Sequence, residues 1–364
     1  MTFAAQRKTG LASVALVLLL TFVFIGLFDA DTLTGWVSYL AMSCTPIQVV
    51  LAVHWAHDLP PGLARRPRPV RGGILVAITL ALGSAVALLF EATVGGGNGP
   101  HFPPLVMFSI VAVVVSFWLA IVLAGWPFVL LGNKAITVAA MLLTCYVVAL
   151  LAYRGLFDFS FLRGTPVYIE GLDPGGAFNA WYALTFLVTS ITGMFLVRSF
   201  EFWPFAHING AAARGAIWTG VCLLWGTLMF GIGVGLFGVD VVAFLVRVAI
   251  PLLFGGLTVL NVLRGPLYVR PEQPLRGVLN VITVATIGSG LVLLFQVLSL
   301  LVAGLLSFGP PTYDLEIWLA SATLGVAFPL LVLHAEFLDF WPFGTNDRPT
   351  DQPQTTISTP RPPV

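Results

Sequence analysis

Long apolar runs recur ten times along this chain, and they limit its possible folds more than any other feature. A helix needs about 20 apolar residues to cross the hydrocarbon core of a bilayer. Charged residues make up only 9% of the chain, against roughly 25% in a soluble domain. The sequence therefore predicts an all-α, polytopic integral membrane protein. We expect about ten transmembrane helices, at approximately 11–28, 35–57, 73–94, 104–125, 134–153, 179–200, 216–237, 241–263, 278–307 and 316–340.

Basic residues in the connecting segments gather on the side of the N-terminus. They include the group Arg65, Arg66, Arg68 and Arg71, whereas the segments on the other side hold few arginines. Lysine and arginine near helix ends mark the cytoplasmic side. We therefore expect a multi-pass protein of the cell membrane with both termini in the cytoplasm. The net charge of +1 provides no concentrated basic face, so nucleic acid is not an expected partner.

The tripeptide Trp-Pro-Phe occurs three times, far more often than composition alone predicts. The copies are residues 126–128, 203–205 and 341–343, and each closes an even-numbered apolar run. Runs two and eight end instead at Pro60 and Pro266, so these prolines lie roughly 60 to 80 residues apart along the chain. The pattern predicts about five repeated two-helix hairpins with Trp-Pro-Phe ends.

The hairpins are expected to form one transmembrane domain over residues 1–343. Residues 344–364 are rich in Pro, Thr and Gln and contain few apolar residues, which predicts a disordered cytoplasmic tail. The basic, proline-rich loop 58–72 is expected to contact anionic lipid headgroups.

The motif has a physical explanation at the membrane surface. Proline ends a helix because it has no N–H and clashes with the preceding turn. Tryptophan settles at the headgroup level with its ring body in the apolar region. Trp126, Trp203 and Trp341 are therefore predicted interface anchors. A docking surface for a partner subunit is the alternative interpretation.

A polar layer is predicted near the cytoplasmic ends of three even runs. Six residues before the closing proline stand His54, Arg198 and Glu336, and three before it stand His57, Glu201 and Asp339. One interpretation is a set of interfacial residues, with Arg198 and Glu201 paired along their own helix. A second is a polar vestibule or proton relay of a transporter. A third is a metal or haem site, for which the sequence offers these ligand types: His54, His57, His334, Glu336 and Asp339.

A substrate site is the remaining hypothesis for the apolar runs. Arg247 is the most deeply placed formal charge, and its expected partner is Glu91 or Asp240. Three even runs contain a proline at one level, where a kink frees backbone groups to line a cavity. Gln48 and Gln296 lie near that level. The predicted substrate-binding residues are Arg247, Gln48, Gln296 and Glu91.

These features favour a permease-like protein that moves a small solute across the membrane. A membrane subunit of a redox or oxygenase complex, and a non-catalytic anchor or assembly subunit, stay open as alternatives. The chain has no phosphate-binding glycine loop, HExxH or GxSxG motif. Whether it is an enzyme stays open, and no cofactor is specified.

Overall fold

The computed structural model describes residues 3–56, 59, 61–100, 104–166, 168–263, 268 and 271–344. Ten helices in this part of the chain are long and apolar enough to cross a membrane. The prediction of an all-α polytopic membrane protein is thereby confirmed. We number the spans 1 to 10 in chain order. They cover Lys8–Ile25, Ala30–His54, Arg68–Thr93, Pro104–Val122, Lys134–Leu156, Ala180–Ser199, Ala211–Leu236, Val241–Val262, Leu275–Val302 and Asp314–Phe337.

Spans 2, 3, 7 and 9 each differ from their predicted bounds by about five residues at one end. Span 3 begins at Arg68 instead of residue 73, because Pro69 occupies the first turn, where a missing N–H costs no hydrogen bond. Span 9 ends at Val302 instead of residue 307, ahead of Gly304, whose positive φ of 75° is incompatible with a continuing helix. The short turn between spans 7 and 8 is found where expected.

Burial alternates along the chain and divides the spans into two rings. Within an apolar 18-residue stretch of each span, 67–78% of the residues are buried in the even spans but only 22–28% in the odd spans. A helix that is apolar on all sides and largely covered belongs to the interior of a bundle. Spans 2, 4, 6, 8 and 10 therefore form an inner ring, and spans 1, 3, 5, 7 and 9 surround it.

The outer spans are long helices with few interruptions. They are α1 (Phe3–Ile25), α5 (Arg68–Thr93), α7 (Lys134–Leu156), α9 (Ala211–Phe230) continued by the π-helical η6 (Gly231–Leu236), and α12 (Leu275–Val302).

The inner spans alternate between α-helical and π-helical turns, except span 6, which is the single helix α8 (Ala180–Ser199). Span 2 contains α2 (Ala30–Thr32), η1 (Leu33–Val37) and α3 (Ser38–His54). Span 4 contains α6 (Pro104–Phe117) and η2 (Trp118–Val122). Span 8 contains α10 (Val241–Phe244), η7 (Leu245–Ala249), α11 (Ile250–Leu257) and η8 (Thr258–Val262). Span 10 contains α13 (Asp314–Ala320), η9 (Ser321–Ala327), α14 (Phe328–Val332) and η10 (Leu333–Phe337).

The inner spans close into a ring. α3 packs on α6, α6 on α8 and α8 on α11. α11 then packs on η9, and η9 packs on α3. The segments at the centre of the molecule therefore come from five separate parts of the sequence.

Small residues hold the outer spans close to the inner ring. A Cβ added at Gly83 of α5 would lie 2.8 Å from Cys44 Cα of α3, and one at Gly226 of α9 would lie 2.8 Å from Ser190 Cα of α8. Gly288 of α12 faces the backbone of Pro251 in α11 in the same way. Such contacts allow helix backbones to pack at short distance within a membrane.

The three Trp-Pro-Phe segments share one backbone conformation. The two residues before each tryptophan have positive φ, and each Trp-Pro peptide bond is cis. All three lie at one end of the bundle, which we call the Trp-Pro-Phe face. Pro60 and Pro266, which were predicted to close spans 2 and 8, lie outside the described residues.

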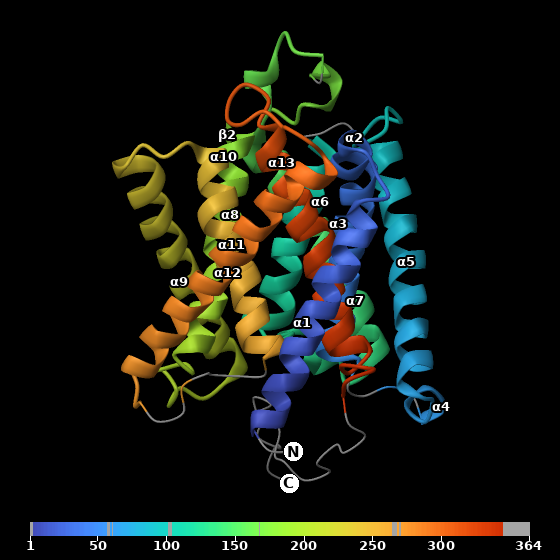
Figure 1. Ribbon diagram of the computed structural model, residues 1–364, viewed down its shortest axis with the longest axis vertical. Coiled ribbons are helices and arrows are strands. Elements are labelled where there is room, and N and C mark those ends of the chain that lie inside the picture. The colour runs from blue at the N-terminus through green and yellow to red at the C-terminus, as the bar shows by residue number, and fades with distance from the viewer. Residues whose placement is uncertain are drawn as a thin grey trace.

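The two faces of the bundle differ in their connections. The Trp-Pro-Phe face holds α4 (Pro61–Ala64) and η3 (Phe128–Leu131). The opposite face holds the longest connection, which contains η4 (Ser160–Leu162) and η5 (Glu170–Leu172) between β1 (Phe157–Asp158) and β2 (Phe178–Asn179). These strands form a two-residue parallel pair. This connection extends beyond the ends of the helices (Figure 1).

Candidate functional site

A large cavity among the described residues is a groove between spans 1 and 3, with spans 2 and 10 as its floor. Its volume is about 660 Å³, which lies in the range of ligand pockets in proteins, roughly 300–1,000 Å³. We call it the lateral groove. Its walls include Trp36, Leu80 and Leu88, whose side chains are 53%, 50% and 65% exposed. The groove is therefore open toward the lipid side of the outer ring.

Among the polar side chains in the largely apolar lining of the groove, three form hydrogen bonds that are described here. Tyr39 donates a hydrogen bond to the Ala87 carbonyl oxygen at 2.7 Å, which ties span 2 to span 3. Gln48 Nε2 donates to the Pro329 carbonyl oxygen at 2.8 Å, which ties span 2 to span 10. Glu91 Oε1 accepts from the backbone N–H of Gly99 at 2.9 Å. Few polar groups in a largely apolar pocket are typical of a site that orients a lipophilic ligand.

The floor of the groove is an irregular part of span 10. Pro329 is the second residue of α14, which lies between the π-helical η9 and η10. Proline cannot donate the helical hydrogen bond, so the turn that precedes it widens. Such turns are frequent at functional sites. Gln48 contacts span 10 at this irregular segment.

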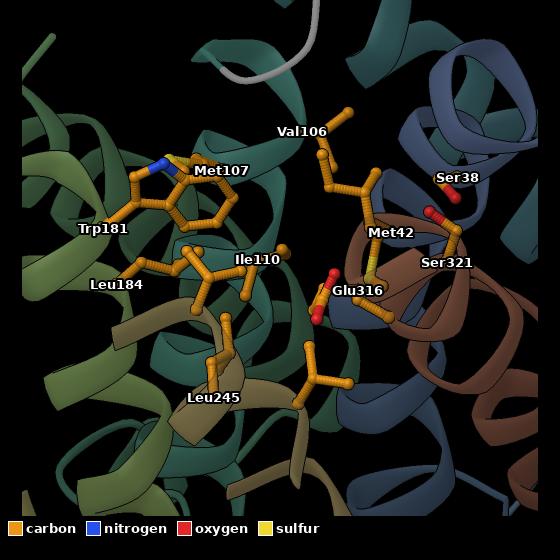
Figure 2. A pocket seen from close by; sticks show the side chains of 14 residues that line it. Ser38, Met42, Val106, Met107, Ile110, Trp181, Leu184, Leu245, Glu316 and Ser321 are labelled. Atoms are coloured by element: carbon orange, nitrogen blue, oxygen red, sulfur yellow. The ribbon is translucent and has the colours of Figure 1, made fainter. Parts of the chain in front are cut away.

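A second, much smaller cavity lies on the axis of the inner ring, near the face opposite the Trp-Pro-Phe face. We call it the axial cavity. Its volume is about 30 Å³, enough for about one water molecule. Every inner span contributes to its wall, and most of the lining residues are apolar (Figure 2).

Glu316 of α13 is the acidic residue of the axial cavity. Its carboxyl group points into the space between Met42 and Ile110 (Figure 2). The residue is 2% exposed. Oε2 accepts a hydrogen bond from the Gly309 backbone N–H at 3.3 Å, whereas Oε1 has no hydrogen-bond partner within the described chain. Ser38 Oγ, on the same wall, is also buried without a partner there.

An aromatic hydroxyl group lies next to Glu316, just outside the span. Tyr313 donates a hydrogen bond to Asp240 Oδ2 at 2.8 Å, which joins the start of span 10 to the start of span 8. Burial, followed by this bond and by the negative charge of Asp240, raises the pKa of Tyr313 to about 12. The tyrosine is therefore a neutral donor at physiological pH.

Below the axial cavity, the centre of the ring is closed by large apolar side chains. Phe117, Leu253 and Phe328 line a space of about 20 Å³. Phe117 and Phe328 meet edge to face, with ring centroids 5.6 Å apart. The ring therefore has no open passage at this level among the described residues.

The predicted polar layer is found at the Trp-Pro-Phe face, but its side chains bond between spans. Arg198 Nη1 donates to Asn261 Oδ1 in span 8 at 3.0 Å and interacts electrostatically with Glu336 of span 10. Glu201 pairs with Arg276 of span 9 at 3.2 Å. The expected pairing of Arg198 with Glu201 along one helix is wrong, because Glu201 follows the end of α8 and has positive φ, which turns it away from the helix face.

The proposed metal ligands are spread over this layer. His54 packs against Gly125 of the first Trp-Pro-Phe segment, whereas His334 packs edge to face on Phe340 of the third. Asp339 forms an ion pair with Arg68 at 3.4 Å. His57 lies outside the described residues. Within the residues that the structure describes, no three His, Cys, Asp or Glu side chains form a group that could hold a metal ion.

The structure brings together two of the four predicted substrate residues. Gln48 and Glu91 both line the lateral groove, but Arg247 and Gln296 are not part of its lining. Arg247 is exposed, and its guanidinium lies over the Phe308 ring at 4.5 Å. In the described chain it pairs with neither of its two expected acidic partners, because those carboxylates accept hydrogen bonds from Gly99 and from Tyr313.

Glu316 is a site residue that the sequence did not single out. It stands at the start of an apolar run, where an acidic residue is ordinarily part of a hydrated helix end. The available signal was its position as the first residue of a run that holds few other charged residues. Only the packing of the five inner spans shows that this carboxyl group is enclosed.

The chain was also compared with known protein families, with curated proteins and with solved structures. None of these comparisons finds a match. The function is therefore argued from the geometry alone.

Proposed function

We propose that this protein is a permease-like membrane protein that binds a small lipophilic solute in the lateral groove and moves it across the bilayer. The solute has an apolar body and a hydroxyl or amino head group. The single observation that carries the proposal is the lateral groove itself, which combines about 660 Å³ of apolar space with Gln48 and Glu91.

The chemistry of the lining supports this class of solute. The apolar walls favour a hydrophobic body by removing its surface from water. The carboxylate of Glu91 is a hydrogen-bond acceptor and, when ionised, attracts a cationic head group. Because the groove opens toward lipid, a molecule dissolved in the bilayer reaches it without crossing the aqueous phase.

The irregular floor of the groove supports movement. Span 10 carries π-helical turns on both sides of Pro329 and is joined there to span 2 by the Gln48 hydrogen bond. Interrupted helices beside a binding site recur in transporters. A shift of α14 changes the shape of the groove while leaving the outer spans in place.

We also propose that the chain consists of five two-helix units arranged around the axis, with the Trp-Pro-Phe face in the cytoplasm. In support of this, four outer spans begin with a glycine that packs on the end of an inner span. The pairs are Gly10 on Leu263, Gly72 on Leu338, Gly215 on Leu123 and Gly277 on Phe200. In each pair the outer span and the inner span belong to neighbouring units of the ring. Gly10 of span 1, for example, packs on the end of span 8, and the next inner span around the ring is span 10. Spans 10 and 1 therefore form one unit.

A fluorescence experiment tests binding in the groove. Trp36 stands at the groove wall and is 53% exposed. A brominated long-chain primary amine in nanodiscs is expected to quench wild-type fluorescence more strongly than that of Trp36→Phe. Filling the groove by Ser84→Trp is expected to weaken binding of the unlabelled amine, measured by competition, whereas Ala85→Trp, on another side of α5, leaves it unchanged. Equal competition in both variants would reject the groove as the binding site.

The redox alternative keeps one specific observation in its favour. The Nε2 atoms of His54 and His334 are buried without hydrogen-bond partners in the described chain, and an unpartnered imidazole nitrogen is a possible ligand. Visible absorption and elemental composition of the purified protein test it. A haem band or stoichiometric metal that disappears in His334→Ala would favour a redox subunit over a permease.

A further inference from the structure

The lateral groove is long and narrow. On α5 its lining extends from Val76 to Glu91, which is about 22 Å at roughly 1.5 Å per residue. Spread over this length, the volume of about 660 Å³ leaves a mean cross-section of about 30 Å². Apolar chains in contact lie about 4.5 Å apart, so one chain occupies roughly 20 Å². The groove therefore has room for one extended alkyl chain but not for two chains side by side.

One end of the groove, near the Trp-Pro-Phe face, is closed. Below Val76, α5 packs directly on span 10, where a Cβ added at Gly72 would lie 2.9 Å from the Phe337 carbonyl oxygen. One turn further, Arg68 Nε pairs with Asp339 Oδ2 at 3.4 Å. The side chains of Val76 and Phe337 line this closed end. Because they offer no hydrogen bond to a polar head group, this end suits the tip of an apolar chain.

The opposite end of the groove carries hydrogen-bond acceptors, and we call it the acceptor end. Glu91 and Thr32 line it, near the end of span 3 and the start of span 2. One oxygen of Glu91 accepts the hydrogen bond from Gly99. A carboxyl group has two oxygens that together accept several hydrogen bonds. The acceptor end can therefore bind a head group that donates hydrogen bonds.

A carboxylate at the acceptor end favours an amine over an acidic head group. Asp29 accepts hydrogen bonds from the Thr32 backbone N–H at 2.8 Å and from its hydroxyl group at 3.1 Å. These bonds, the backbone bond first, lower the pKa of Asp29, which lies just outside span 2 and is therefore ionised at neutral pH. In the described chain no basic residue lines the groove. The acceptor end therefore repels a carboxylate or phosphate head group.

We propose that the solute of the lateral groove is a single-chain amphiphile with an amino head group, an assignment that rests on the proposed function. The head group lies at Glu91, and the chain is directed toward Phe337. Half of the hydrocarbon core of a bilayer is about 15 Å thick, and the groove is about 22 Å long. A chain that fills the groove therefore reaches past the middle of the bilayer.

The position of a quencher on the chain tests the orientation. Trp36 lies about one helical turn from Thr32 and is 53% exposed in the groove wall. Hexadecylamine that carries bromine next to its amino group is expected to quench the Trp36 signal, taken as wild type minus Trp36→Phe, more strongly than hexadecylamine brominated at the chain end. Equal quenching, or the reverse order, would overturn the orientation.

Shortening the groove from its closed end tests the extended chain. Val76→Trp is expected to weaken hexadecylamine binding at least about tenfold, because methylene groups lose their buried place. Octylamine is too short to reach this end and is expected to bind with unchanged affinity. Ala77→Trp is the matched control, since Ala77 is exposed and outside the lining, and both amines are expected to bind it as they bind the wild type. An equal loss for both amines in Val76→Trp, or no loss for either, would overturn the proposal.

The head group is tested by competition with hexadecanoate, which has a chain of the same length and a carboxylate head. It is expected to compete weakly, and competition equal to that of hexadecylamine would overturn the choice of an amine. Failure of the proposed function gives a different result, because hexadecylamine binding would then be insensitive to Ser84→Trp. The bromine comparison does not use Val76→Trp, so it tests the orientation even if that variant does not fold.

Discussion

The lateral groove and the axial cavity lie on opposite sides of the same two helices. Spans 2 and 10 present Gln48 and Pro329 to the groove, and Ser38 and Glu316 to the axis. The groove is about 660 Å³ and open to the outside, whereas the axial cavity is about 30 Å³ and enclosed. Their polar groups differ as well, because Glu91 and Gln48 have hydrogen-bond partners, whereas Glu316 Oε1 has none among the described residues.

This difference separates two requirements of a membrane protein that handles a lipophilic molecule. The groove offers space, and its polar side chains Gln48 and Glu91 already have hydrogen-bond partners. It therefore suits a ligand that does not need to neutralise a buried, unpaired charge. The axis offers tight packing and a cavity of about 30 Å³, so it has no room for a ligand large enough to fill the groove. Any motion of span 10 would change both sites together, since α13 and α14 belong to one continuous span.

The largest expected difference in stability is between two phenylalanine-to-alanine substitutions, one on the axis of the inner ring and one in the wall of the lateral groove. Phe328 of the axis is 1% exposed, and Phe24 of the groove is 39% exposed. Phe328→Ala leaves a void in a packed interior and is expected to destabilise the protein by about 3–5 kcal/mol. Phe24→Ala removes a partly exposed ring and is expected to cost about 1 kcal/mol or less. Chemical denaturation in detergent measures both, and equal losses would show that the axis is no more tightly packed than the groove.

A second contrast concerns ligand binding. Ser84→Trp fills the groove and is expected to weaken binding of the long-chain amine at least about tenfold, which corresponds to about 1.4 kcal/mol. Phe328→Leu, which changes the axis, is expected to leave the affinity unchanged. Competition against the brominated amine measures both variants. If the axial variant weakened binding as strongly as Ser84→Trp, the ligand would lie on the axis.

Gln48 joins spans 2 and 10 on the groove side, and its loss is expected to have a smaller effect. Gln48→Leu leaves the Pro329 carbonyl oxygen without its side-chain donor, so a loss of stability of about 1–3 kcal/mol is expected. Thr79 is the control, because it also lines the groove but donates to Leu75 within its own helix. Thr79→Val is expected to cost less than Gln48→Leu in thermal unfolding, and the reverse order would contradict a structural role of the Gln48 bond.

The smallest predicted effect depends on pH and concerns Tyr313. Its pKa is about 12 in the folded protein, against an ordinary value of 10.0. Since the folded state keeps the proton longer, the stability from this group is fully present below about pH 10 and is lost as the pH rises toward 12. Tyr313→Phe is expected to remove this part of the alkaline loss. Identical pH profiles of unfolding for the two proteins would show that the Asp240 bond is not formed in the membrane.

Much of the architecture could be predicted from the apolar runs, but the side chains that meet in a cavity could not. The ten runs and the three Trp-Pro-Phe segments mark where helices cross and end. Gln48 and Glu91 were predicted site residues and share the groove, whereas Arg247 turns outward onto Phe308. Helices that are apolar on every side give no periodic signal of which face is covered. Glu316 shows the same limit, because its enclosure depends on four other spans.

The most direct test of the central claim is translocation of a fluorescent long-chain amine in proteoliposomes, followed by a membrane-impermeant reductant that bleaches only the outer leaflet. With the wild type, the protected inner-leaflet signal is expected to fall steadily as probe crosses the bilayer, and with Ser84→Trp it is expected to stay protected as in protein-free vesicles. Ala85→Trp is expected to behave as the wild type. Equal protection in wild type and protein-free vesicles, or wild-type translocation by Ser84→Trp, would contradict passage through the lateral groove.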